Sequence, residues 1–111
     1  MRARIKWDIP DKLLKGEKIL NMSPTKFLSA VPSPCREYVT ALSDIKRKSC
    51  FSQSSIKYLS NEVKEGRSLD IPFLDYERPF RGFPSHEGRH TALVALRMNM
   101  EKIPVLVIGK D

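Results

Sequence analysis

The most informative segment of the chain is Pro84-Ser-His-Glu-Gly-Arg-His-Thr-Ala-Leu-Val-Ala-Leu-Arg-Met-Asn-Met-Glu-Lys-Ile-Pro-Val-Leu-Val-Ile108. Both histidines of the protein lie near its start, one on each side of Gly88. The apolar residues that follow recur at helical spacing, which predicts a helix that begins near Gly88. Ile103–Ile108 is short and rich in β-branched residues, which predicts a buried strand. The segment therefore predicts a glycine turn, then a helix, then a strand.

The predicted turn has the features of an anion site. The first amide groups of a helix point out of its N-terminal end, where the helix dipole is positive. A glycine lets the backbone approach an anion closely, because it has no Cβ atom. Gly88, Arg89 and His90 therefore predict a phosphate-binding turn. Arg89 would pair with the phosphate charge, and His90 would donate a hydrogen bond or, in an enzyme, transfer protons.

The same residues satisfy the zinc pattern His-Glu-x-x-His, from His86 to His90. On a helix this spacing places two imidazoles on one face, and the glutamate activates a zinc-bound water. This hypothesis needs His86 inside the helix and a third ligand, for which Glu101 is the acidic candidate before Asp111. A third interpretation is a polar helix start with surface histidines and no ligand, because motif matches without context are weak.

The run Glu87-Gly-Arg-His-Thr-Ala-Leu-Val-Ala-Leu is followed by Met98-Asn-Met-Glu-Lys-Ile-Pro-Val-Leu-Val. Together they resemble the closing motif of the ParB/sulfiredoxin superfamily. In that group a Gly-x-His-Arg or Gly-Glu-Arg-Arg turn opens a helix, and a short loop leads to an Ile-Pro-Val strand. The resemblance is close over Glu87–Val107 and looser over most of the chain from Ile19 onward. It implies a ParB-like nucleotide- or DNA-binding domain.

Two positions depart from the superfamily pattern. In the sulfiredoxin branch the turn binds ATP phosphates, and a catalytic cysteine follows the glycine. That position is Arg89 here, so sulfinic-acid reductase activity is not implied. Thr91 stands where an arginine usually follows the histidine; Arg89 could supply the guanidinium from the neighbouring position, and Thr91 could donate its hydroxyl. The resemblance makes CTP or ATP the candidate nucleotides and Mg²⁺ a candidate metal.

Composition limits the class of protein. The 111 residues are enough for one domain with its own core, and 41% hydrophobic with 30% charged residues is ordinary globular composition. Lys and Arg exceed Asp and Glu by 20 to 13, for a net charge of +7. Such a charge favours DNA or nucleotide partners; the alternative is a basic surface that serves solubility. No apolar run is long enough for a membrane span and no secretory signal is visible, so a cytoplasmic protein without a membrane partner is expected.

The N-terminal half alternates short elements with turns. Residues 1–16 form a candidate arm, and the alternation of Arg2, Arg4 and Lys6 with apolar residues predicts a short edge strand. Trp7 is expected to pack on the core. A strand is predicted for Glu17–Met22, and a short helix over 25–30 begins after Ser23 and a proline, with Phe27 and Leu28 buried. Another helix is predicted over 34–48; Cys35 falls in its apolar register, and with Cys50 it is too few for a disulfide framework.

In the second half, a helix is predicted over 54–65, with Ile56, Leu59 and Val63 inward and Gly66 as its stop. Residues 69–76 predict a strand, and Pro72 indicates either an edge strand or a position in the first part of the strand only. Residues 77–85 are predicted to be irregular. Their arginines and the aromatic rings of Phe80 and Phe83 suit a nucleotide lid, or else the rings fix the loop to the core.

The sequence thus predicts an α+β fold, a small mixed β-sheet of three to five strands with packed helices, in one ParB/sulfiredoxin-like domain over residues 1–111. The function expected is binding of nucleotide phosphates or a DNA backbone. The alternatives are a ParB-like nuclease with a metal on Glu87 and Asp75, a zinc hydrolase, or a non-catalytic interaction module of a viral, plasmid or other mobile-element protein. The predicted catalytic residues are Glu87, His90 and His86. The predicted phosphate or nucleic-acid contacts are Gly88, Arg89, His90, Thr91, Arg81, Arg78, Lys46, Arg47 and Lys48.

Overall fold

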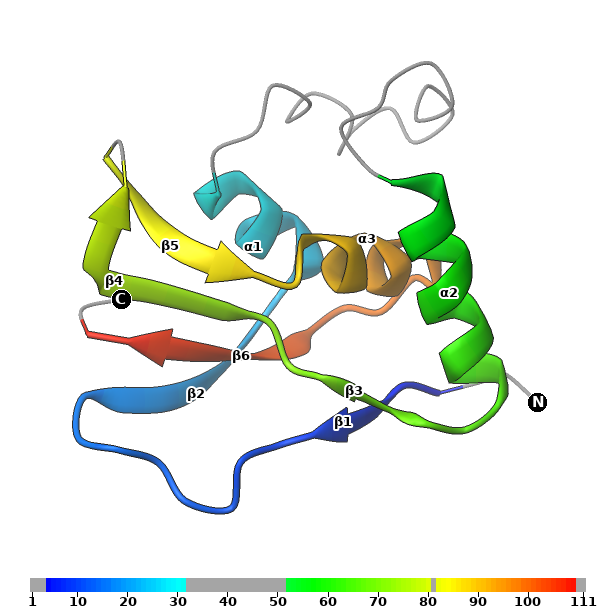
Figure 1. Ribbon diagram of the computed structural model, residues 1–111, viewed down its shortest axis with the longest axis horizontal. Coiled ribbons are helices and arrows are strands. Elements are labelled where there is room, and N and C mark those ends of the chain that lie inside the picture. Colours follow the sequence, from blue (N-terminus) through cyan, green and yellow to red (C-terminus); the bar gives the residue numbers. More distant parts are fainter. Residues whose placement is uncertain (1–3, 32–51, 81, 110–111) are drawn as a thin grey trace.

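The computed structural model describes residues 4–31, 52–80 and 82–109 (Figure 1). It is a mixed α+β domain with two small sheets and three helices in this part of the chain. The elements in chain order are β1 (Lys6–Asp8), β2 (Glu17–Met22), α1 (Pro24–Ala30), α2 (Gln53–Lys64), β3 (Ser68–Asp70), β4 (Phe73–Phe80), β5 (Phe83–Glu87), α3 (Arg89–Arg97) and β6 (Ile103–Ile108).

The main sheet has the strand order β2-β6-β4-β5. β6 pairs antiparallel with β2 and parallel with β4, and β4 pairs antiparallel with β5. Leu74 of β4 lies opposite Val107 of β6, and both are buried, whereas their neighbours Phe73 and Leu106 are only partly buried. One face of the sheet therefore forms the core. Residues of α1 and α3 belong to the same buried cluster. They include Phe27 of α1 and the run from Ala92 to Ala95 of α3.

The second sheet is the parallel pair β1–β3, beside α2 (Figure 1). The predicted N-terminal strand is confirmed over Lys6–Asp8. Trp7 packs against the core as expected, and Ile5 beside it is buried. β1 is not an edge of the main sheet; it pairs with β3 in a sheet of its own.

Several predicted elements are confirmed with small shifts in their bounds. β2 and β6 have the predicted ends, and α1 begins at Pro24, where the hydroxyl of Ser23 accepts a hydrogen bond from the Lys26 amide at 3.0 Å. α2 places Ile56 and Val63 in the core, with Leu59 packed against it. Gly66 follows this helix with a φ of 76°. The predicted helix over 34–48, the two cysteines, Arg81 and the Lys46–Lys48 cluster lie outside the described residues.

The prediction for residues 69–85 is wrong in two respects. The strand expected over 69–76 is divided into β3 and β4, because Pro72 has no amide hydrogen and the chain changes sheets there; the Pro72 carbonyl instead accepts a hydrogen bond from the Leu106 amide at 2.9 Å. β4 then lies between β6 and β5, not at an edge. The stretch expected to be irregular contains the end of β4 and most of β5, joined near Gly82, whose φ is 81°. Pro84 is tolerated because β5 is the edge strand.

None of the helices in the described ranges is long and apolar enough to cross a membrane.

Candidate functional site

Gly88 forms the turn between β5 and α3, as the sequence predicts. It is the N-cap residue of α3, and its φ of 106° is a conformation that residues with a side chain rarely adopt. A Cβ atom here would lie 2.5 Å from the Cβ and 2.6 Å from the Cα of Pro72. The link between β3 and β4 therefore packs directly against the turn, and only glycine fits there.

α3 begins immediately after this turn. The Ala92 amide donates to the Gly88 carbonyl at 2.9 Å, which closes the first helical turn. The amides of Arg89, His90 and Thr91 precede that bond, so by helix geometry they are directed out of the N-terminal end. The residues from Thr91 to Ala95 are buried, so the helix is held firmly against the core. The start of α3 is therefore a rigid, positively polarised end of a helix.

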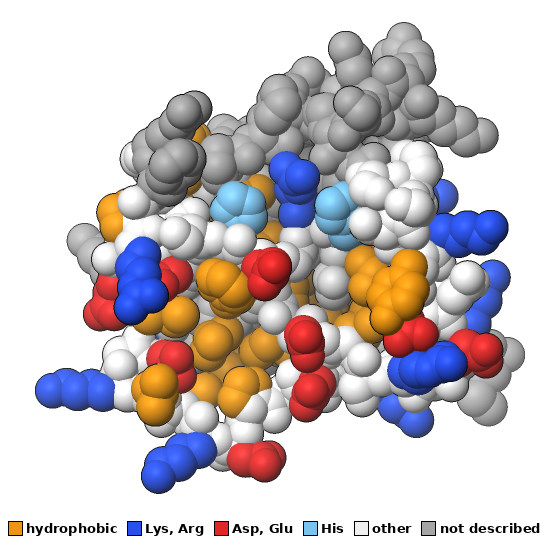
Figure 2. Space-filling model, in the orientation of Figure 1, with side chains coloured by type: hydrophobic (Ala, Val, Ile, Leu, Met, Phe, Trp, Pro, Cys, Tyr) orange, Lys and Arg blue, Asp and Glu red, His pale blue; other side chains and the backbone are white. Residues whose placement is uncertain are grey.

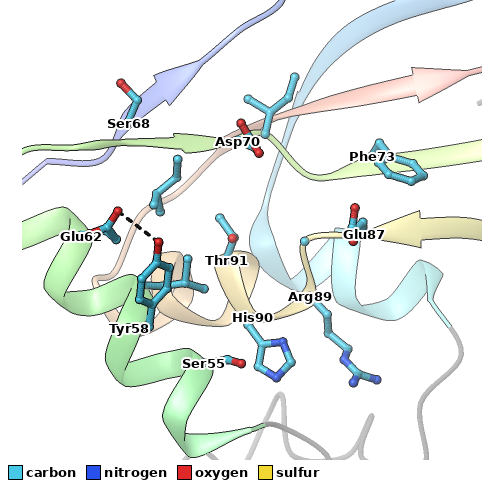
Figure 3. Close-up of a pocket in the computed structure, with 14 residues that line it drawn as sticks. Ser55, Tyr58, Glu62, Ser68, Asp70, Phe73, Glu87, Arg89, His90 and Thr91 are labelled. Carbon is cyan, nitrogen blue, oxygen red and sulfur yellow. Dashed lines mark hydrogen bonds between the residues drawn. The ribbon is translucent and has the colours of Figure 1, made fainter.

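The turn borders a pocket of about 580 Å³ (Figure 3). Its wall is formed on one side by α2 and on the other by the segment from β3 to the start of β4, with the end of β5 and the first turn of α3 between them. The lining residues are Ser55, Tyr58, Leu59, Glu62, Ser68, Leu69, Asp70, Ile71, Phe73, Glu87, Gly88, Arg89, His90 and Thr91.

α2 presents one face to this pocket. Ser55, Tyr58, Leu59 and Glu62 are three or four residues apart, so they lie on one side of the helix. The Tyr58 hydroxyl donates to a Glu62 carboxylate oxygen at 3.4 Å, and Arg67 forms an ion pair with Glu62 at 3.2 Å. Tyr58 is 61% exposed, which leaves its ring accessible from the pocket.

His90 connects the starts of two helices. The amide of Ser52, the N-cap residue of α2, donates to Nε2 of His90 at 2.8 Å. Burial lowers the pKa of His90 below its ordinary value of 6.5, and the neighbouring Arg89 charge lowers it further. The ring is therefore neutral near pH 7, and because Nε2 is the acceptor, its proton is on Nδ1. A donor or proton-transfer role for His90 is thus restricted to Nδ1.

Charge is divided within the pocket. Its lining contains three carboxylates, Glu62, Asp70 and Glu87, and one guanidinium, that of Arg89. In the close-up, Arg89 and His90 project to one side of the α3 start, whereas Asp70 and Glu62 lie across Thr91 on the other side (Figure 3). Acidic side chains also gather below the two histidines on the molecular surface (Figure 2). Asp70 and Glu62 therefore give the pocket an acidic side, whereas Glu87 and Arg89 flank the Gly88 turn, although the whole chain carries +7.

The two histidines are not arranged as the zinc hypothesis requires. His86 is in β5 and His90 is in α3, so Gly88 separates them and they do not share a helix face. His86 lies opposite Leu74, and its Nδ1 is 3.4 Å from the Pro84 carbonyl oxygen. It does not line the pocket. Within residues 4–31, 52–80 and 82–109, no three His, Cys, Asp or Glu side chains are grouped so that they could hold a metal ion.

Some of the other predicted site residues lie together in the pocket, and some do not. Gly88, Arg89, His90, Thr91 and Glu87 all line the pocket. Asp75, the second metal ligand of the nuclease hypothesis, is outside the lining and accepts a hydrogen bond from the Glu77 amide at 3.0 Å. Arg78 lies toward the far end of β4, where its carbonyl accepts a hydrogen bond from the Ser85 hydroxyl, so it is not part of the pocket.

Nine of the fourteen lining residues were not predicted from the sequence as site residues, and Tyr58, Glu62, Asp70 and Phe73 are the ones with functional groups or rings suited to a ligand. The spacing of Tyr58 and Glu62 was a usable signal, because it places them on the polar side of a predicted amphipathic helix. Asp70 and Phe73 had only a weak signal, their position on either side of Pro72.

Comparison with known proteins adds no assignment: no family model, no curated protein and no solved structure matches the chain.

Proposed function

We propose that this chain is a ParB-like domain that binds nucleotide phosphates at the turn that opens α3. The observation that carries the proposal is the Gly88 turn, where the packing of Pro72 enforces glycine and the start of α3 faces a pocket. The resemblance of Glu87–Val107 to the ParB/sulfiredoxin closing motif supports it, because that motif has the same order of turn, helix and strand.

The chemistry of the donor groups fits a phosphate. The N-terminal end of α3 offers amide hydrogens and a positive dipole, and Arg89 supplies a guanidinium, which pairs well with phosphate oxygens. The Thr91 hydroxyl is a further candidate donor that lines the pocket. The amides of α3, Arg89 and Thr91 can therefore bind a phosphate chain even though His90 carries no positive charge. A Mg²⁺ ion, where it accompanies the nucleotide, would screen phosphate charge.

The acidic side of the pocket favours a single nucleotide over a nucleic-acid strand. Carboxylates repel a continuous phosphate backbone, but they accept hydrogen bonds from ribose hydroxyls and from the amino groups of bases. Asp70 and Glu62 stand on that side, and Tyr58 offers a ring on which a base can stack. We therefore infer that the phosphates lie toward Arg89 and the nucleoside toward α2 and β3.

Thermal unfolding with CTP and ATP, each with and without Mg²⁺, tests this proposal. A ligand at 100 times its Kd stabilises a protein by about 2.7 kcal/mol, and for a domain of this size that raises Tm by roughly 10 °C. We expect one nucleotide to give such a shift and Arg89→Gln to abolish most of it. Arg97→Gln, at the other end of the same helix, is the matched control and should retain the shift. The absence of a shift with either nucleotide would contradict the proposal.

Assays of DNA binding and DNA cleavage with the same protein preparation distinguish the alternative functions. Tight DNA binding that weakens steeply with salt, without a nucleotide shift, would favour a nucleic-acid backbone as the ligand. Plasmid nicking in Mg²⁺ that Glu87→Ala and His90→Ala both abolish would favour the nuclease.

A further inference from the structure

A second groove lies on the other side of α2, between α2 and the C-terminal half of α3. Its volume is about 600 Å³, similar to that of the Gly88 pocket. The two cavities share no lining residue, because they are bordered by different faces of α2. The residues that line the second groove are Gln53, Ile56, Lys57, Ser60, Val63, Lys64, Val94, Arg97 and Met98. We name this cavity the α2–α3 groove.

The α2–α3 groove combines an apolar floor with a cationic rim. Ile56, Val63 and Val94 form the base of the groove and are buried in the core, whereas Met98 is only partly buried and is the more accessible apolar residue. Lys57, Lys64 and Arg97 contribute the charge, and no carboxylate lines the groove in the described part of the chain. No ion pair of these three cations occurs among the residues that the structure describes, whereas Arg67 nearby is paired with Glu62.

The three cations have a regular arrangement. Lys57 and Lys64 are seven residues apart on α2, which is two helical turns or about 10 Å. Arg97 lies across the groove in the last turn of α3. A rim of this length, with cations on both sides of an apolar floor, matches a helix that has carboxylates on its flanks and apolar residues along its centre.

We propose that the α2–α3 groove binds an acidic amphipathic helix of a partner protein. The positive charge on the rim, which forms no ion pair within the described ranges, is complementary to Asp and Glu side chains, and it steers such a partner to the groove. The partner's apolar residues would contact the floor mainly at Met98, whose flexible side chain adapts to different shapes. A DNA or RNA backbone would use the cations but leave the apolar floor without a contact, so a protein helix is the better match. The proposal is independent of nucleotide binding at Gly88.

A fluorescently labelled model peptide tests the proposal. The probe is an amphipathic helix of Leu and Glu, and a Leu and Lys peptide of the same pattern is the charge control. Fluorescence anisotropy with the full chain should show saturable binding of the acidic peptide and none of the basic one. Amide chemical shifts in a ¹⁵N spectrum should change around Ile56, Ser60, Val63 and Arg97.

Two variants locate the site. The double variant Lys57→Glu/Lys64→Glu should weaken binding at least about tenfold, because it replaces attraction with repulsion. The matched control, Lys12→Glu/Lys15→Glu, makes the same change in net charge on exposed cations before β2 and should alter Kd less than twofold. Ser60→Tyr, which fills the groove without a change in charge, should also weaken binding, and an unchanged Tm would show that the variants fold.

Three results would overturn the proposal. The first is no saturable binding of the acidic peptide. The second is equal weakening by both double variants, which would indicate attraction to net charge alone. The third is a DNA duplex that competes for the groove with the same dependence on Lys57 and Lys64, which would reassign it to nucleic acid.

Discussion

The two sides of α2 border cavities of similar size but opposite chemistry. On one side, the pocket at Gly88 has three carboxylates, one guanidinium and a rigid helix start. On the other, the α2–α3 groove has three cations, no carboxylate among its described lining residues, and an apolar floor. The net charge of +7 therefore does not indicate the character of each cavity. The phosphate site that we propose at Gly88 depends on backbone geometry and not on summed charge.

Rigidity is the second difference between the two cavities. The Gly88 pocket depends on a backbone contact that excludes any side chain, whereas the rim of the α2–α3 groove consists of the exposed side chains Lys57, Lys64 and Arg97. Substitutions should therefore affect stability strongly at the first site and weakly at the second.

Gly88→Ala should be the most damaging of these changes. The new methyl group would overlap Pro72, and the residue would hold a φ of 106°. We expect a loss of about 3 kcal/mol or more in the free energy of unfolding, from overpacking and backbone strain together. Urea denaturation measures this loss.

Gly82→Ala is the matched control for Gly88→Ala. Gly82 also has a positive φ, of 81°, but no atom lies within 4 Å of the position of its Cβ. Gly82→Ala should lower the free energy of unfolding by only about 1 kcal/mol, which is the cost of a positive φ for a residue with a side chain. Equal losses at the two glycines would show that the Pro72 contact does not constrain the turn.

His90→Leu should have an intermediate effect. It removes the acceptor of the Ser52 amide, so the N-terminus of α2 loses its connection to α3. We expect a loss of about 1 kcal/mol, because water partly satisfies the exposed amide. Hydrogen exchange should show faster opening at the start of α2 than at its end. Equally faster amide exchange along the whole of α2 would contradict a local effect of the Ser52–His90 hydrogen bond.

The same histidine predicts a pH dependence of stability. Because the pKa of His90 is lower in the folded state than 6.5, the unfolded chain binds more protons below that pH. Stability should therefore be complete above about 6.5 and fall as pH decreases from there through the lowered pKa. In His90→Leu this part of the profile should be flatter; an unchanged profile would mean that other groups cause it.

Lys64→Gln and Arg97→Gln should have the smallest effect. Both side chains border the α2–α3 groove without an ion pair in the described structure, so each substitution should change the free energy of unfolding by less than about 0.5 kcal/mol. Thermal unfolding checks this. A larger loss would mean that the rim contributes to the fold and is not primarily a binding surface.

The parts of the fold that depend on local signals were predicted correctly. Ser23 before Pro24 marks the start of α1, and Gly88 before an apolar helical run marks the start of α3. β6 was predicted from its short length and its β-branched composition. In each case neighbours in the chain determine the conformation.

The parts that depend on partners far along the chain were missed. Residues 77–85 were predicted to be irregular, whereas they hold the end of β4 and the first part of β5; only the position of β5 at the sheet edge makes Pro84 acceptable in a strand. The hydrogen bond from Ser52 to His90 spans 38 residues, so no local pattern indicates it. Asp70 enters the pocket because the Pro72 link packs on Gly88, which is a tertiary contact.

The most direct test of the account is a ¹⁵N chemical-shift titration of the full chain with the nucleotide, CTP or ATP, that raises its Tm. We predict saturable shifts of the Gly88, Arg89, His90 and Thr91 amides, with smaller shifts at Tyr58 and Asp70 and none at Lys57, Lys64 or Arg97. Saturable shifts confined to the α2–α3 groove, or no shift at the start of α3 under saturating nucleotide, would contradict it.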